Sequence, residues 1–196
     1  MRVDLVHGIH TSENKKAFPA LISPFFREKG FASVEHYYGH IFAIQTRWKN
    51  PKILEELKKK IPQNSIYVGH SNGCTLGWML AEAGVRFRGM VLVNPALDRN
   101  KVVSHAKFVH VYYNSGDSAV ALSRLLAFHP WGAMGKYGPS FRDPRYKNFD
   151  TGNVSGMPRV SGHSAIYTKK ENREAWGKLI VQNVLDELTG KELEEL

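Results

Sequence analysis

The sequence is poor in cysteine and in long hydrophobic runs. Cys74 is the only cysteine among 196 residues, so no disulfide bond can form within the chain. No apolar run approaches the roughly 20 residues that a membrane-spanning helix needs. The first residues lack the apolar core of a signal peptide and reach a His-Gly pair within a few positions. These absences predict a cytoplasmic protein without an integral membrane segment.

Acidic residues are also few. The 18 Asp and Glu residues stand against 27 Lys and Arg residues, which gives a formal net charge of +9. Such a field favours anionic partners, of which nucleic acid, a membrane surface and an acidic substrate are the main classes. The lysines of segment 52–60 are interspersed with glutamates, as on the solvated face of an amphipathic helix, so nucleic acid is not an expected partner. A glycine-rich phosphate loop and a dinucleotide fingerprint are absent as well, and no cofactor is expected.

Segments typical of strands and of helices alternate along the chain. Short apolar runs predict strands at 2–6, 33–38, 65–69, 89–94, 107–114 and 147–150. Apolar stripes at helical spacing predict helices within 13–30, from Asn50-Pro51 to about 61, at 73–84, at about 119–127 and at 171–188. This alternation predicts an α/β fold: a three-layer sandwich with a mainly parallel sheet of about six strands and helices on both faces.

The whole chain, 1–196, is expected to form one domain, because its length suits one sizeable core and no repeat or boundary is visible. The Gly- and Pro-rich segment 129–146 is too long and irregular for a simple connection. Long loops of this kind are commonly functional, so a lid-like loop is expected there.

One short stretch, "VGHSNGC" at 68–74, carries most of the functional information. Gly69, Ser71 and Gly73 form the pattern G-x-S-x-G between a predicted strand and a predicted helix. A serine on so tight a turn takes a strained backbone conformation, and its neighbours two positions away must be small because the chain passes close by. The turn lifts the hydroxyl above the sheet and aims it at a helix N-terminus, where free amides can hold an anion. The pattern therefore favours a nucleophile over purely structural glycines.

With this turn, the sequence resembles the α/β-hydrolase superfamily at four places. The segment "GHSNG" resembles the nucleophile elbow, and "HGIH" at 7–10 resembles the oxyanion loop. The segment "NSGDSAV" at 114–120 resembles the acid loop, and "SGHSAIY" at 161–167 resembles the histidine loop. The family's usual sheet begins with two more strands than this chain has before its oxyanion loop, so the resemblance implies a minimal form of about six strands.

The resemblance also implies a role for each matching residue. The chain order of nucleophile, acid and histidine is kept as Ser71, Asp117 and His163. Ser71 would attack an acyl carbon, His163 would take its proton, and Asp117 would orient the imidazole. The backbone amides of Ile9 and Asn72 would form the oxyanion hole. No cofactor is needed for this chemistry.

Several alternatives remain beside this assignment. Asp98 follows the preceding strand, where some relatives place the acid, and His129 is the rival of His163. The pairs 7 and 10, and 36 and 40, give histidine spacings that can suit a metal. However, no carboxylate or cysteine cluster joins them, so no metal is expected.

The pocket is expected to take a small-molecule acyl substrate. The pocket walls are expected from the oxyanion loop, from the loop near Phe42 and Trp48, and from the region 130–141, which together are rich in aromatic residues. Within these stretches His10, Trp131 and Phe141 are predicted to bind the substrate. Basic residues in the same stretches allow for an anionic group on the substrate, and these are Lys136, Arg142 and Arg145. Esterase, thioesterase, amidase and peptidase share this machinery, and a non-catalytic binding protein on a hydrolase scaffold is the alternative from another class.

Overall fold

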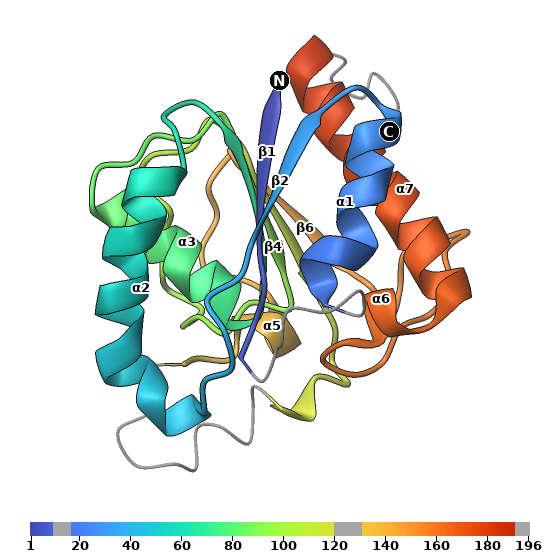
Figure 1. Ribbon diagram of the computed structural model, residues 1–196. Coiled ribbons are helices and arrows are strands. Elements are labelled where there is room, and N and C mark those ends of the chain that lie inside the picture. Colours follow the sequence, from blue (N-terminus) through green and yellow to red (C-terminus); the bar gives the residue numbers. More distant parts are fainter. Residues whose placement is uncertain (10–16, 120–130, 191–196) are drawn as a thin grey trace.

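A computed structural model describes residues 1–9, 17–119 and 131–190. These residues are built around a parallel six-stranded sheet with the spatial order β2-β1-β3-β4-β5-β6 (Figure 1). The strands are β1 Arg2–Val6, β2 Ala32–His36, β3 Ile66–His70, β4 Gly89–Val93, β5 Val109–Tyr113 and β6 Tyr146–Asp150. All six overlap the predicted strands, and the predicted α/β fold class is confirmed.

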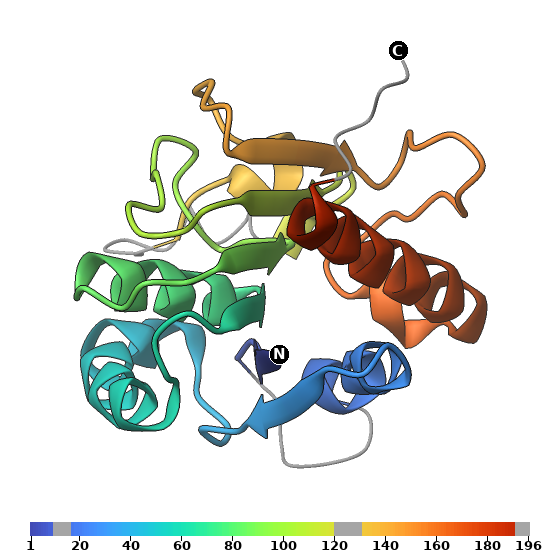
Figure 2. The ribbon, with the colours of Figure 1, turned by 90° about the horizontal axis from the view of Figure 1, so that it is seen from above.

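Helices cover both faces of the sheet. They are α1 Phe18–Glu28, the 3₁₀ turn η1 Ala43–Gln45, α2 Thr46–Lys60, α3 Asn72–Glu82, α5 Met134–Tyr137, α6 Ala165–Thr168 and α7 Lys170–Thr189. Figure 2 shows α2 and α3 on one side of the sheet and α1 and α7 on the other. The predicted helix at 119–127 lies, except for Ala119, outside the described residues.

The strands divide their side chains between two hydrophobic cores. In β3, Ile66 and Val68 pack in the core beneath α1 and α7, whereas Tyr67 packs in the core beneath α2 and α3. Successive side chains of a strand point to opposite faces, so a strand covered on both faces must be apolar at nearly every position. This explains why the strand segments are short continuous apolar runs rather than alternating ones.

The start of α2 differs from the prediction. The helix begins at Thr46 rather than at Asn50-Pro51, so Pro51 lies inside it. Two contacts stabilise the additional turn at the amino end. The Thr46 hydroxyl donates to the carbonyl of Ala43 at 2.7 Å. The buried Asn50 side chain is hydrogen-bonded to Asn72 of α3. Contacts with a distant helix thus override the local preference of proline for the first helical turn.

The segment 129–146 is described from residue 131 onward. It contains the short helix α5, and Trp131, Ala133 and Met134 are buried. Met134 belongs to the core beneath α2 and α3. The described part of this segment is therefore packed into the domain, and its lid-like role stays a prediction.

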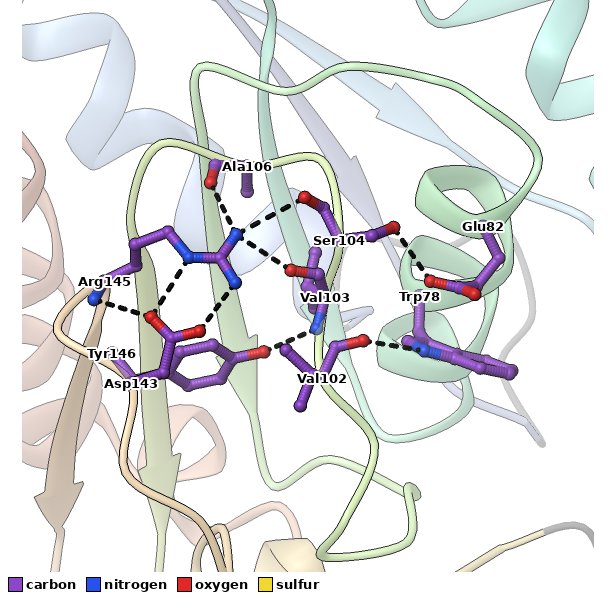
Figure 3. A network of polar contacts seen from close by, with 9 residues as sticks. All are labelled: Trp78, Glu82, Val102, Val103, Ser104, Ala106, Asp143, Arg145 and Tyr146. Atoms are coloured by element: carbon purple, nitrogen blue, oxygen red, sulfur yellow. Dashed lines mark hydrogen bonds and ion pairs between the residues drawn. The ribbon is translucent and has the colours of Figure 1, made fainter.

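The loop between β4 and β5 is held by a network around Arg145 (Figure 3). The Arg145 guanidinium donates to the carbonyls of Val103, Ser104 and Ala106 at 3.1, 3.4 and 3.2 Å. Asp143 accepts two further hydrogen bonds from the same guanidinium, at 3.0 and 2.6 Å. One side chain thereby satisfies three loop carbonyls at the amino ends of the central strands.

A buried carboxylate lies within β1. Asp4 is fully buried and accepts hydrogen bonds from His36 of β2 at 2.7 Å and from Arg2 at 2.7 Å. Arg2 also donates to the carbonyl of Lys60 at the end of α2. Burial raises the pKa of Asp4, but the hydrogen bonds and charges of His36 and Arg2 outweigh burial and leave that pKa below its ordinary value.

No helix within the described residues is long and apolar enough to cross a membrane.

We predict that Asp4→Asn destabilises the fold by about 2 kcal/mol near neutral pH, because it removes one member of a buried ionic cluster. A carboxylate with a lowered pKa stabilises the fold above its unfolded pKa of about 3.9, and this contribution is lost as the pH falls through the folded pKa. Urea unfolding should thus show a difference between wild type and Asp4→Asn that shrinks below about pH 4. Glu55→Gln, at a side chain that is 63% exposed, is the control and should change stability little. A pH-independent effect of Asp4→Asn would contradict the prediction.

Candidate active site

The turn between β3 and α3 holds Ser71 in an unusual backbone conformation. Its φ is 55° and its ψ is −120°, a region that non-glycine residues rarely occupy. The Ser71 amide donates to the carbonyl of Val93 at 3.0 Å, and the Ser71 carbonyl accepts from the amides of Cys74 and Ala96. Bonds to β4 and to the chain that follows it therefore maintain the strain.

The two glycines of the pattern lie where no side chain fits. A Cβ atom on Gly69 would approach the amide nitrogen of Cys74 to 2.9 Å. A Cβ atom on Gly73 would approach the carbonyl oxygens of Val6 and His7 to 2.5 and 2.7 Å. This is the close packing of strand, turn and helix that the sequence predicts.

The segment after β1 lies directly against the serine. A Cβ atom on Gly8 would lie 2.9 Å from Ser71 Cβ and 3.3 Å from Ser71 Oγ. Ile9 follows and is partly buried, whereas His10, predicted to line the pocket, lies outside the described residues. The structure thus brings Gly8 of the predicted oxyanion loop beside the turn.

His163 is bonded to Asp117, which is fully buried. The Nδ1–H group of His163 donates to Asp117 Oδ2 at 2.8 Å, and the His163 side chain is 21% exposed. Asn94 donates to the same carboxylate oxygen at 3.1 Å. Because Nδ1 carries the proton, Nε2 of neutral His163 has a free lone pair and can accept one.

The alternative acid, Asp98, is not bonded to His163 among the contacts of the described residues. Its side chain is exposed and borders a groove formed by α2, α3 and the chain after β4, near Lys101. Of the two acids considered, Asp117 is the one bonded to His163. His129, the alternative histidine, lies outside the described residues.

His70 links His163 to the serine turn. Its Nε2–H group donates to the carbonyl of His163 at 3.0 Å, and the two imidazole rings lie 4.9 Å apart. Burial lowers the pKa of His70 to about 3, so the ring is neutral near pH 7. No hydrogen bond joins Ser71 Oγ to His163 Nε2 among the contacts of the described residues. The contacts of His70 therefore join the loop of His163 to the residue that precedes Ser71.

The side chain of Asn72, the first residue of α3, is the centre of a buried polar network. It exchanges two hydrogen bonds with Asn50 at 3.0 and 3.1 Å and donates to the Tyr38 hydroxyl at 3.2 Å. The indole N–H of Trp131 donates to Asn72 Oδ1 at 3.2 Å. Trp131, predicted to line the pocket, is only 8% exposed and supports the start of α3 through this bond.

A second set of contacts ties the segment after β1 to this network. The Tyr38 hydroxyl donates to the carbonyl of His7 at 2.9 Å, and the Tyr38 amide donates to His7 Nε2 at 3.1 Å. His7 Nδ1–H donates to the carbonyl of Gly8. Burial lowers the pKa of His7 to about 4, so its ring is neutral and can accept at Nε2. The backbone around Ile9 is thereby joined to the first turn of α3, whose N–H groups have no acceptor within the helix.

Phe141 and Arg145 are not brought to the turn. Phe141 packs edge-on against Tyr146, the first residue of β6, at the end of the strands opposite to Ser71. Arg145 is engaged by Asp143 and by the loop carbonyls. Both predictions treated the segment after residue 129 as one pocket wall, but this segment runs from Trp131, beside the start of α3, to the amino end of β6 at Tyr146.

Sequence reasoning missed three supporting residues: Tyr38, Asn50 and Asn94. Asn94 has a φ of 45° and is fully buried, and asparagine is one of the few residues that tolerates this region. Its place at the end of β4, directly before Pro95, is the one local signal that could have indicated it. Tyr38 and Asn50 carry no such signal, because their partners are 31 and 22 residues away along the chain.

Within the described ranges, no group of three or more His, Cys, Asp or Glu residues could hold a metal ion.

No protein-family model matches the sequence, and no curated protein matches it. Solved structures with a similar fold do exist. The α/β hydrolase domain-containing protein 10 from mouse is 12% identical, with a TM-score of 0.61 over 97% of this chain and 90% of that one. A predicted CIB-like hydrolase from Thermoplasma acidophilum is 16% identical, with a TM-score of 0.59 over 93% and 85%. A monoacylglycerol lipase from Paleococcus ferrophilus is 13% identical, with a TM-score of 0.54 over 95% and 94%. The chain therefore has the α/β-hydrolase fold.

We predict that Gly73→Ala destabilises the protein by about 2 kcal/mol, because the added methyl group meets two backbone carbonyls that cannot rotate away. Urea unfolding followed by circular dichroism measures this loss. Gly152→Ala is the matched control, since a Cβ atom there meets no atom closer than 3.3 Å. Equal stabilities of the two variants would show that the β1 segment does not pack against α3 as described.

Proposed function

We propose that this protein is a serine hydrolase that cleaves an ester or a related acyl bond through Ser71, His163 and Asp117. The observation that carries the proposal is the hydrogen bond from His163 to the buried Asp117, in a loop whose backbone is bonded to the residue before Ser71. The same hydrogen bond leaves Nε2 as the proton acceptor that a general base requires. The hydrolase names of the similar structures support the same class of reaction.

The proposed reaction has two stages. Ser71 Oγ attacks the acyl carbon while His163 Nε2 takes its proton, and the imidazolium is stabilised by Asp117. The proton then passes to the leaving group, which departs and leaves an acyl-enzyme. Water attacks this ester, again with His163 as the base, and releases the acid and the free serine.

The strained turn contributes to this chemistry in the proposal. It aims Ser71 Oγ toward the first turn of α3, where the amide of Asn72 would stabilise the oxyanion together with the amide of Ile9. One such donor is typically worth about 3 kcal/mol in the transition state. The side-chain network on Asn72 and Tyr38 would keep the backbone segment at Ile9 and the first turn of α3 at a constant separation. In the apo state the serine and histidine need not be bonded, because such contacts often tighten only when the substrate is present.

The side chains predicted to line the pocket bear on the chemical nature of the acyl group. Trp131 donates a hydrogen bond to Asn72, and Phe141 packs against Tyr146 at the amino end of β6. An anionic group on the substrate cannot rely on Arg145, whose guanidinium is occupied by Asp143 and three carbonyls. Ester hydrolysis of a small-molecule acyl substrate is the reaction that we favour, and Lys136 and Arg142 are the remaining cations for an anionic group.

Labelling with a fluorescent fluorophosphonate tests the proposal directly. Wild type should form a covalent adduct at Ser71, detected by peptide mass spectrometry, because the probe needs an activated serine. Ser71→Ala should give no adduct, and His163→Ala should label at least a hundredfold more slowly because the general base is lost. A folded wild-type protein that takes up no probe would favour the binding-protein alternative instead.

The choice of acid gives a second test. Asp117→Asn should lower kcat for a p-nitrophenyl ester by about 10⁴-fold, because the asparagine amide favours the wrong imidazole tautomer. Asp98→Asn makes the same chemical change at an exposed carboxylate and should leave kcat unchanged. The reverse pattern would reassign the acid to Asp98.

A further inference from the structure

Three large apolar side chains lie exposed within residues 42–48. Phe42 is 55% exposed, Ile44 is 69% exposed and Trp48 is 53% exposed. The other large apolar side chains that are exposed in the described residues are single ones in separate segments, namely Met1, Val102 and Tyr137. Single exposed residues are ordinary, but a cluster is typical of an interaction surface. We call Phe42, Ile44 and Trp48 the apolar patch.

The apolar patch lies on the outer side of elements whose inner side supports the candidate active site. It runs from Phe42, the residue before η1, to Trp48 in the first turn of α2. From the same helix, Asn50 is buried and pairs with Asn72 of α3, the residue that follows Ser71. Figure 1 shows the start of α2 at the same end of the molecule as α5 and α6. The patch is thus on the face of the protein at which the strands end and Ser71 lies.

The surroundings of the apolar patch are positively charged. Arg47 and Lys52 are exposed and Lys49 is partly exposed, and the segment 36–54 contains no Asp or Glu. The wider chain adds a net charge of +9. Aromatic and aliphatic side chains flanked by Lys and Arg are typical of segments that lie in the interface of an anionic lipid layer.

We propose that the apolar patch docks the protein onto an anionic lipid surface. Phe42, Ile44 and Trp48 enter the interfacial region, while Arg47, Lys49 and Lys52 contact anionic head groups. A second copy of this chain is the less favourable occupant, because a two-fold contact would bring the same three cations of both copies together. The docking does not depend on Ser71 acting as a nucleophile, so it goes beyond the proposed function.

Vesicle sedimentation of the full-length protein tests the proposal, with phosphatidylcholine vesicles that contain or lack phosphatidylglycerol. Wild type should bind the anionic vesicles at least tenfold more tightly than the neutral ones, and the fluorescence of bound protein should shift to the blue as Trp48 leaves water. The combined change Phe42→Ser, Ile44→Ser and Trp48→Ser should lower binding at least tenfold. Val102→Ser, at an exposed residue outside the apolar patch, should not.

Two triple variants that remove the same charge distinguish docking through the apolar patch from attraction by the net charge of the whole protein. Arg47→Gln, Lys49→Gln and Lys52→Gln together should weaken binding at least tenfold, since each cation near a lipid surface contributes about fivefold. Lys58→Gln, Lys59→Gln and Lys60→Gln remove the same charge at the other end of α2 and should change binding much less. Equal losses from the two variants, or no binding by wild type, would overturn the proposal.

Two further readouts keep the remaining explanations apart. Circular dichroism melting must show that each variant is folded, and light scattering must show one molecular mass for wild type and the patch variant. A dimer that only the patch variant loses would identify a second copy as the occupant and overturn lipid docking. Because sedimentation needs no turnover, a protein that binds anionic vesicles but takes up no fluorophosphonate would retain this surface and lose only the proposed function.

Discussion

The close approach of three backbone segments around Ser71 is the constraint on which the candidate site depends. The turn after β3 is bonded to β4 through the Ser71 amide, and Gly73 brings α3 against the carbonyls at the end of β1. Only glycine fits at these contacts, and the compression keeps Ser71 at a positive φ. Strain of this kind persists only where the surroundings impose it. Here they are the carboxyl ends of adjacent parallel strands, where α/β sheets generally carry their sites.

Buried neutral histidines connect this turn to distant segments. His7 and His70 have pKa values lowered by burial, so their rings act as fixed donors and acceptors and not as charges. His70 holds the backbone of the loop that carries His163, and His7 holds Tyr38. His163, in contrast, is partly exposed and faces a buried carboxylate. The environment thus distinguishes two buried imidazoles with lowered pKa values from one that is partly exposed and bonded to a carboxylate.

The amino ends and the carboxyl ends of the strands carry different kinds of contact. At the amino ends, Arg145 and Asp143 tie down the loop between β4 and β5, and this stabilises the fold without forming part of the site. At the carboxyl ends lie the serine turn, the polar network on Asn72 and, on the outer side of α2, the apolar patch. If the proposed docking holds, a single helix would connect a lipid surface to the start of α3.

The amino-acid sequence by itself determined the order of strands and helices, the parallel sheet and the glycine-flanked turn at Ser71, because these depend on apolar periodicity and on local steric limits. The tertiary structure decided which acid meets His163, where α2 begins, and that Trp131 supports Asn72 while Phe141 and Arg145 lie at the amino ends of the strands. Each of these outcomes rests on contacts between side chains far apart in the chain. The segment at 114–120 indicated Asp117, but only the assembled sheet shows that this carboxylate rather than Asp98 meets His163.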